Sequence, residues 1–466
     1  MATKKRMPRR RALASLGAAF GLCLKAPSFC AVPFPGVVLS GRKGRSDREP
    51  EPLKPIGKAK GIKPGRVVWA FDPRATAWKG VGNGFWWEPE HTSYERVEAM
   101  LQEAVKQLAG EGSEKEAWQT IFRHFNKARG KGDVGYKQGE KIAIKVNFVG
   151  MIFHEGCVDP KTYHIYPRHI NYMNSSPQLI CAVLRRLVEI LGARQRDITL
   201  FDTLAYIADE YFDPIHKRFP EVRWVDFAGR FGRLKPQPSR SKLYWSSRPK
   251  AKADILPSCI AEAEYLINIA NLKAHTGAGI TLCAKNHFGS LIRWPVQRGF
   301  YNLHRATFSK SVGIYRPLVD LIAHNDLGGK TVLYFLDGLY SGKHPIDRAP
   351  RRWRSQPFGG CWTSSIFVSQ DPVAIDSVGF DFLRTEYEDY PRAPGVDDYL
   401  HEAALAEDPP SGTLYNPNTP GEAGGKASER RLGSLGAHEH WNNPEEKRYS
   451  RDLGKDEGIE LIKCLF

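Results

Sequence analysis

The sequence of 466 residues lacks most of the short patterns that assign a protein to a biochemical class. Its eight cysteines include no C-x-x-C pair, which argues against a ferredoxin-type cluster and against a zinc ribbon. It has no zinc-finger spacing and no aromatic RNA-binding motif, so we expect no nucleic-acid partner. Beyond the N-terminus it has no run of about 18 apolar residues, and we therefore expect no transmembrane segment in the mature chain.

Motifs for nucleotide binding and for metalloprotease chemistry are missing as well. The chain has no G-x-x-x-x-G-K-[ST], no G-x-G-x-x-G after an expected strand and no H-E-x-x-H. The net charge is +17, and seven of the positive charges lie in the first 25 residues. The remaining excess is scattered, which is typical of a solvated surface. The alternative is attraction to an anionic partner such as an acidic glycan or a membrane surface.

The first 36 residues have the layout of a secretory signal. A basic stretch ends in Arg9, Arg10 and Arg11, and an apolar run over residues 12–24 follows it. The arginine run resembles a twin-arginine signal, although Pro8 stands where a serine or threonine is usual. We expect export by the twin-arginine machinery and a mature protein that is periplasmic or extracellular. A basic tail without a targeting role is the alternative.

Short apolar segments alternate with helical patterns along the rest of the chain. The expected strands span residues 67–71, 141–147, 197–202, 221–227, 265–270, 331–337 and 364–369. Thr92 and Glu95 form a capping-box pattern before a helix that ends at Gly110. Ser176 and Pro177 are the expected N-cap and first residue of another helix. This alternation predicts an α/β fold, with a mostly parallel open sheet and helices on both faces, as in Rossmann-like proteins.

Composition divides the chain into five expected parts. They are a signal peptide (1–36), a linker (37–64), an N-terminal strand with a helical extension (65–135), an α/β core domain (136–405) and an irregular C-terminal arm (406–466). The arm is rich in Gly, Pro and Asn, which favours loops. Within the arm, His438 and His440 could share a metal ion, but a surface loop is the reading that we favour.

Polar residues follow the expected strands at their carboxyl ends. Ligands bind at these ends in open parallel sheets, so we expect the polar groups to converge on one rim. The residues concerned are Asn147, Asp202, Asn271, Lys273, His275, Asp337, Gln370 and Asp371. Each alone is also compatible with a turn or a helix cap. Asp371 before Pro372 is typical of an N-cap, and we expect Asp371 to be structural.

The most informative segment is residues 271–289, a glycine-rich stretch with two lysines, a histidine and an asparagine. We expect Lys273, His275, Lys285 and Asn286 to form one catalytic or anion-binding site. These residue types suit oxyanion binding or general acid–base chemistry, and a solvated loop is the alternative. We also expect the N-terminal amides of the helix that carries Lys285 to favour an anion.

Two blocks, LINIANLKAHTGAGITLCAKNHFGSL and SQDPVAIDSVGFDFL, resemble the domain-of-unknown-function-362 family over roughly residues 140–400. The family pattern falls here on Lys273, His275, Lys285, Asn286, Gly289, His304, Asp337, Gly338, Asp371, Pro372 and Asp376. The resemblance implies a fold and a site but no reaction. Some members carry ferredoxin-like cysteine clusters, and this chain has none, so we expect no iron–sulfur cluster.

Two functions remain open from the sequence. The first is an exported enzyme that acts on an anionic small molecule or glycan, with a metal or another cofactor as an option. A divalent metal would be held by Asp337, His304 and Asp376, because neutral imidazoles and carboxylates suit such ions. The second is a non-catalytic periplasmic binding protein for an acidic ligand or glycan. Lysines with perturbed pKa values would favour the enzyme, and an open aromatic groove would favour the binding protein.

Overall fold

The computed structural model describes residues 53–344, 346–420 and 432–466, all of which belong to one unit, Arg45–Phe466. The expected signal peptide, 1–36, and the expected linker as far as residue 52 lie outside the described residues. Among the residues that are described, no helix is both long and apolar enough to cross a membrane.

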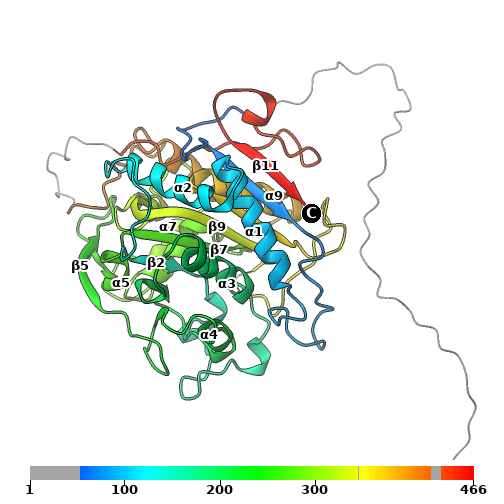
Figure 1. Ribbon diagram of the computed structural model, residues 1–466. Coiled ribbons are helices and arrows are strands. Elements are labelled where there is room, and N and C mark those ends of the chain that lie inside the picture. The colour runs from blue at the N-terminus through cyan, green and yellow to red at the C-terminus, as the bar shows by residue number, and fades with distance from the viewer. Residues whose placement is uncertain (1–52, 345, 421–431) are drawn as a thin grey trace, which may run out of the picture. The chain divides into compact units, whose positions relative to one another are not determined.

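A nine-stranded sheet runs through the described part of the chain (Figure 1). Its strands are β1 (Arg66–Phe71), β2 (Ile142–Lys145), β3 (Ile198–Asp202), β4 (Arg223–Asp226), β7 (Tyr265–His275), β8 (Gly279–Ile280), β9 (Thr331–Gly342), β10 (Ser365–Ser369) and β11 (Glu460–Leu465). The order across the sheet is β11-β1-β10-β9-β7-β2-β3-β4, and β8 pairs with the end of β7. A separate hairpin joins β5 (Pro238–Leu243) and β6 (Asp254–Pro257).

The strands from β9 to β4 are all parallel, whereas β10 is antiparallel to both of its neighbours, β9 and β1. Strand β11 is parallel to β1. Strands β7 and β9 are buried almost throughout, as expected of strands covered on both faces. The α/β fold with a mostly parallel open sheet is therefore confirmed.

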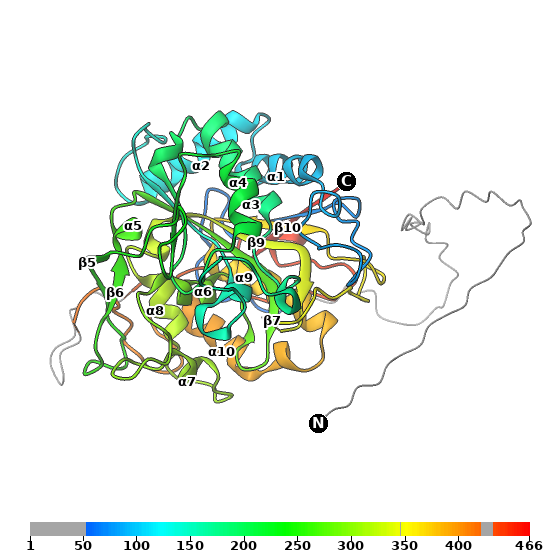
Figure 2. The same ribbon diagram turned by 90° about the horizontal axis from the view of Figure 1, so that it is seen from below.

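Helices cover both faces of the sheet (Figure 2). One face carries α1 (Tyr94–Ala109), α2 (Glu114–Ala128), α3 (Pro177–Arg185) and α4 (Asp209–His216). The other carries α6 (Cys283–Asn286), α7 (Leu303–Thr307), α8 (Pro317–Ala323), α9 (Pro372–Glu386) and α10 (Pro394–Ala404), and the short α5 (Ser258–Ala261) follows β6. Two apolar cores result, one on each side of the sheet.

Helix ends largely follow the sequence signals. Ser176 caps α3 and Gly110 ends α1 in the left-handed conformation that glycine adopts readily. The expected cap of α1 was wrong by one residue, because Ser93 rather than Thr92 accepts a hydrogen bond from the amide of Arg96. The Thr92 hydroxyl instead donates to the carbonyl of Trp86 (2.7 Å).

Two strands are longer than expected, and this changes the setting of the candidate site. Strand β7 continues to His275 and β9 to Gly342, because the two strands keep pairing and β7 also pairs with β8. Lys273 and His275 therefore lie in a strand, not in a glycine-rich loop as predicted.

The terminal regions also contribute to the sheet. Strand β1 belongs to the expected N-terminal extension, and β11 to the C-terminal arm that was expected to be irregular. Pairing with β1 orders the last residues of the arm. The expectation of a surface loop at His438 and His440 was wrong, because both side chains are buried against α9.

The chain reverses its direction across the sheet between β2 and β7. From β2 it moves outward to β3 and β4, and it then returns to the other side of β2 to form β7 and β9. Such a switch point is where open α/β sheets form ligand sites, at the carboxyl ends of the strands.

Candidate functional site

Five polar side chains meet at this switch point and form what we call the polar network: Lys145, Asn147, Asp202, Lys273 and Asn286. The Nζ atom of Lys273 donates to Oδ1 of Asn147 (2.8 Å), and Nδ2 of Asn147 donates to Oδ1 of Asn286 (3.0 Å). The Nζ atom of Lys145 lies 3.1 Å from both Asn286 Oδ1 and Asp202 Oδ2. Each of the five side chains is almost fully buried. The network thus joins β2, β3, β7 and α6.

Strand register explains why these side chains meet. Lys145 of β2 stands beside Asn268 of β7, since the two strands are parallel neighbours. Asn268 accepts a hydrogen bond from Asn286 (2.8 Å) and donates to the carbonyl of Cys283 (2.9 Å), which holds α6 against the sheet. Gly289 closes the packing, because a Cβ atom there would lie 2.4 Å from Asp202 Oδ1.

Asp337 adds a carboxylate beside this network. Its Oδ2 atom accepts hydrogen bonds from the amide and the hydroxyl of Ser176, both at 2.7 Å, at the start of α3. Burial raises the pKa of Asp337, while the bonds from Ser176 and the charge of Lys273 oppose that rise. For Lys273, burial and then the charge of Lys285 hold the pKa well below its usual value.

Lys285 differs from the other two lysines of the site. In the part of the chain that the structure describes, its ammonium group has no hydrogen-bond or ion-pair partner. It lies 4.5 Å from the centre of the Phe288 ring, a cation–π contact. Burial lowers the pKa of Lys285 to about 7. The amine is therefore poised between its charged and neutral forms near neutral pH.

Two histidines, His275 and His304, lie near Lys285, and a third, His344, lies beside His275 with the ring centroids 6.0 Å apart. Together the four residues form what we call the cationic rim: His275, Lys285, His304 and His344. All four are partly exposed, in contrast to the polar network. Burial, followed by the charge of Lys285, lowers the pKa of His304 to about 3 and that of His275 well below its usual value. The pKa of His344 is lowered by burial as well.

Hydrogen bonds and ring contacts hold the rim histidines in defined orientations. Nδ1 of His275 accepts from the amides of Gly277 (3.0 Å) and Ala278 (3.2 Å), which places the hydrogen of the neutral ring on Nε2. The ring of His304 stacks on Phe308, with centroids 4.5 Å apart, and lies 5.5 Å from Phe288. His344 lies 3.0 Å from the hydroxyl of Thr276.

This arrangement is chemically suited to an anion. The site holds three lysines and two carboxylates, Asp202 and Asp337. Among the residues that the structure describes, only Lys145 of these lysines forms an ion pair, with Asp202 (3.1 Å). An anion on the rim would favour the charged forms of Lys285 and the histidines, which burial disfavours. The rim residues are the partly exposed members of the site, so solvent reaches the site there.

The structure brings all four expected residues, Lys273, His275, Lys285 and Asn286, to the carboxyl ends of β2 and β7, with Asp337 beside them. His304 approaches from α7, because its ring lies 5.5 Å from the Phe288 ring that Lys285 also contacts. Their catalytic role stays a prediction.

The expected metal ligands do not come together in the same way. Among the described residues, Asp337, His304 and Asp376 do not form a group with ligand atoms within 4.8 Å of one another. The carboxylate of Asp376 accepts from the amides of Cys283 (2.8 Å) and Ala284 (3.1 Å) and from the Tyr399 hydroxyl (2.6 Å). It therefore caps α6, and the amides that were expected to favour an anion are already bonded.

Asp371 is a helix cap, as expected. Its Oδ1 atom accepts from the amides of Val373 (3.0 Å) and Ala374 (2.9 Å) at the start of α9. Its other oxygen accepts from the amides of Lys60 (2.8 Å) and Ala437 (3.1 Å), so it also ties two distant segments to the helix.

Several site residues were missed by sequence reasoning. Lys145 carried a signal, because a lysine near the end of an otherwise apolar strand has to find a partner when the strand is buried. Ser176 was identified only as a cap, although it also binds Asp337. His344 had no signal, because it reaches the rim only through the unexpected extension of β9.

Comparison with known proteins identifies the family but no relative of defined activity. No curated protein matches the chain. The family model described as Domain of unknown function (DUF362) matches residues 142–381, which is just over half of the chain. The match begins at β2 and ends within α9, so it includes the polar network, Asp337 and the cationic rim. The chain belongs to the DUF362 family.

Proposed function

We propose that this protein is an exported enzyme that binds an anionic small molecule or glycan on the cationic rim and uses Lys285 to transfer a proton. The observation that carries the proposal is the unpaired ammonium of Lys285, whose pKa burial lowers to about 7. A lysine that is largely shielded from solvent normally has an acidic partner, and its absence among the described residues leaves room for an anion of the ligand.

The same pKa suits general acid–base chemistry. A catalytic group is most effective when its pKa lies near the working pH, and Lys285 satisfies this near neutrality. His275 presents an N–H from Nε2, while the polar network below holds Lys273 and Asn286 in place. In this proposal His275 orients the oxyanion, the buried Lys273 adds positive charge from below when it is protonated, and Lys285 gives or takes the proton.

Export is part of the proposal and rests on the N-terminal sequence. Arg9, Arg10 and Arg11 precede an apolar run of signal length. Replacing all three arginines by lysine should leave the protein in the cytoplasm, as judged by fractionation of cells. Normal export of that variant would point to another route or to the absence of a signal.

A binding protein without turnover is the second candidate, and the aromatic side chains of the rim favour it. His304 stacks on Phe308 and lies near Phe288 and Trp294, so the rim offers ring faces beside its cations. Aromatic faces of this kind also stack on sugars in a glycan site. The two candidates share the anion site and differ only in whether the bound ligand is changed.

The test is anion binding to the mature protein, measured by calorimetry with phosphate, sulfate and uronic acids. Lys285→Met should weaken binding by about tenfold to hundredfold, the value of one charge-assisted hydrogen bond. Lys310→Met is the matched control, since Lys310 is an exposed lysine a short distance along the chain. Equal affinities in all three proteins, or no binding at all, would overturn the proposed site.

A further inference from the structure

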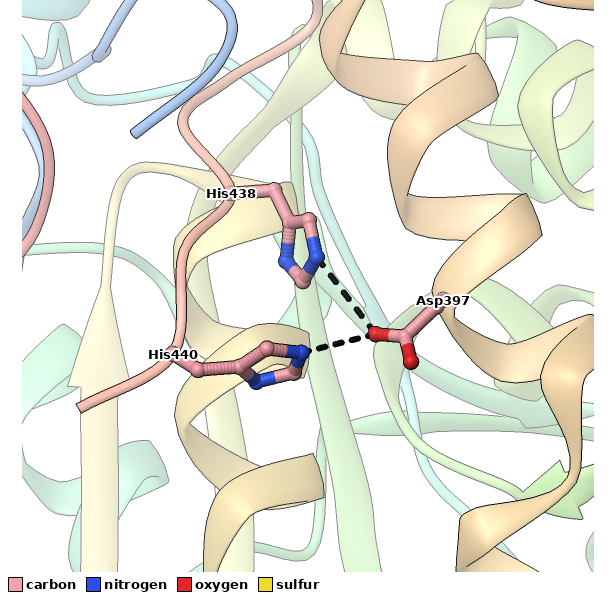
Figure 3. Close-up of side chains that lie close together, drawn as sticks. All are labelled: Asp397, His438 and His440. Carbon is pink, nitrogen blue, oxygen red and sulfur yellow. Dashed lines mark hydrogen bonds and ion pairs between the residues drawn. The ribbon is translucent and has the colours of Figure 1, made fainter. Parts of the chain in front are cut away.

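A second cluster of titratable side chains lies outside the region that the family model matches. Asp397 comes from the first turn of α10, and His438 and His440 come from the segment that follows residue 431 (Figure 3). Nε2 of His440 is 2.8 Å and Nε2 of His438 is 3.6 Å from Oδ1 of Asp397. One ligand atom from each residue lies within 4.8 Å of the other two.

Side chains of α9 contact both imidazole rings at Nδ1, the ring nitrogen that does not face Asp397. Nδ1 of His440 is 2.7 Å from Oδ1 of Asp381. Nδ1 of His438 is 2.8 Å from the hydroxyl of Ser377. Ser377 and Asp381 are four residues apart, so they lie on the same side of the helix. Metal-binding histidines are typically fixed in this way, with one ring nitrogen bonded to a carboxylate or another oxygen and the other facing the ion.

Hydrogen-bond directions then decide what faces Asp397. The Ser377 hydroxyl donates to the carbonyl of Val373 (2.8 Å), so it accepts from Nδ1 of His438. The neutral ring of His438 consequently turns a lone pair on Nε2 toward the carboxylate of Asp397. Asp381 likewise accepts from Nδ1 of His440. A ring lone pair that faces a carboxylate at these distances calls for a cation between them, and at His440 that cation is either a metal ion or the proton of the charged ring.

We propose that Asp397 Oδ1, His438 Nε2 and His440 Nε2 bind a divalent transition-metal ion. Two imidazole nitrogens and a carboxylate oxygen suit zinc and its neighbours in the first transition row. Ligands about 2.0–2.1 Å from a tetrahedral zinc ion lie about 3.3 Å from one another. That spacing falls between the 2.8 Å and 3.6 Å that separate the two histidine nitrogens from Asp397 Oδ1, and all three ligand atoms lie within 4.8 Å of one another.

The fourth position of this ion would face a pocket. Asp397 lines a surface pocket of about 490 Å³ together with Phe380, Arg384, Arg392 and Trp441. The two histidines are buried, whereas 40% of the Asp397 side chain is exposed, so the ligand cluster opens on the Asp397 side. Three protein ligands and one open position are the pattern of catalytic rather than structural zinc sites. Arg384 is paired with Asp381 (2.8 Å), so Arg392 is the arginine of this pocket that would attract an anionic ligand to that position.

The competing occupant is a proton that His440 shares between Asp381 and Asp397. Titration of the chelator-treated protein with zinc, followed by calorimetry and elemental analysis, separates the two. We expect one zinc ion per chain in the wild type. Visible absorption of the cobalt-loaded protein should show the bands of a four- or five-coordinate site and should disappear when zinc is added.

Variants test the ligands one by one. Asp397→Asn and His438→Ala should each weaken zinc binding by more than about a hundredfold, since each removes a direct ligand and second-sphere losses alone cost 10–100-fold. Asp397→Asn keeps the shape of a half-exposed side chain, so it should fold even if His438→Ala does not. His164→Ala, at an exposed histidine, is the control and should bind as the wild type does. No zinc binding by the wild type, or equal binding by Asp397→Asn, would overturn the proposal.

Discussion

The cationic rim and the Asp397–His438–His440 cluster use the same residue type in opposite electrostatic settings. At the rim, burial and the neighbouring lysine lower the pKa of His304 to about 3, so the histidines stay neutral. In the second cluster, burial also lowers the pKa of His440, but hydrogen bonds to Asp381 and Asp397 outweigh it and raise the value to about 9. The first setting favours an anion and the second a cation. A histidine motif in the sequence therefore does not show which kind of ligand it serves.

The two sites also differ in how they are built. The rim rises from the ends of parallel strands inside the family match, where the strand register sets the neighbours of each side chain. The second cluster joins α10 to a late segment beyond the match. We therefore expect the polar network beneath the rim to matter most for stability, and the outer residues of both sites to matter most for binding.

The largest effect on stability is expected at Lys145. Its ion pair with Asp202 is buried, and Lys145→Met leaves the carboxylate without its cation. Losing one partner of a buried pair costs about 3–5 kcal/mol. Denaturant unfolding should show this loss, and Asp202→Asn added to Lys145→Met should recover part of it. A loss below about 1 kcal/mol would show that the network does not support the fold.

The comparison of the two sites predicts that a substitution in one site weakens the binding of that site's ligand only. Lys285→Met should weaken oxyanion binding by about tenfold to hundredfold while zinc binding is unchanged. Asp397→Asn should do the reverse. Calorimetry with both ligands on both variants checks this. If either substitution weakened both ligands equally, the two sites would not be independent.

Ser377→Ala tests whether the hydroxyl bonded to Nδ1 of His438 orients that ring for metal binding. It removes the hydroxyl that accepts from His438 and keeps all three proposed ligands. Zinc affinity should fall by about tenfold, the lower end of second-sphere effects, and oxyanion affinity should not change. Unchanged zinc affinity would mean that Ser377 does not orient the ring.

The pH dependence of anion binding should follow Lys285. Its pKa is lowered to about 7, so the charged form prevails below pH 7 and the neutral form above it. Binding above pH 7 must take up a proton, and affinity should fall by up to about tenfold per pH unit between pH 7 and 9. The Lys285→Met variant should show no such slope. A wild-type affinity that is flat from pH 6 to 9 would rule out this role of Lys285.

The smallest expected effect on binding is at Asp371, which contributes no proposed ligand to either site. Asp371→Ala removes the cap of α9 and the bonds to the amides of Lys60 and Ala437, and it should lower the free energy of unfolding by about 2 kcal/mol or more. Oxyanion and zinc affinities should remain within twofold of the wild type when measured well below the unfolding temperature. A large change in either affinity would place Asp371 in a binding site.

Much of the fold and the centre of the candidate site could be predicted, because apolar strands and their polar ends leave a clear pattern. Lys273, Lys285 and Asn286 were expected together for this reason. The pattern does not show that two strands keep pairing beyond their apolar residues, so the continuation of β7 and β9 was missed. The position of His344, which follows the extended β9, was missed for the same reason. The burial of His438 and His440 was missed because it depends on packing against α9, a contact between segments about 60 residues apart.

The central claim concerns the protonation state of the Lys285 amine, and NMR titration of the lysine side chains measures it directly. With Lys285→Met to assign the signal, the account predicts a pKa near 7 for Lys285 in the free protein and a clear rise when an oxyanion binds. A pKa near the ordinary 10.5, unchanged by every anion tested, would contradict the account.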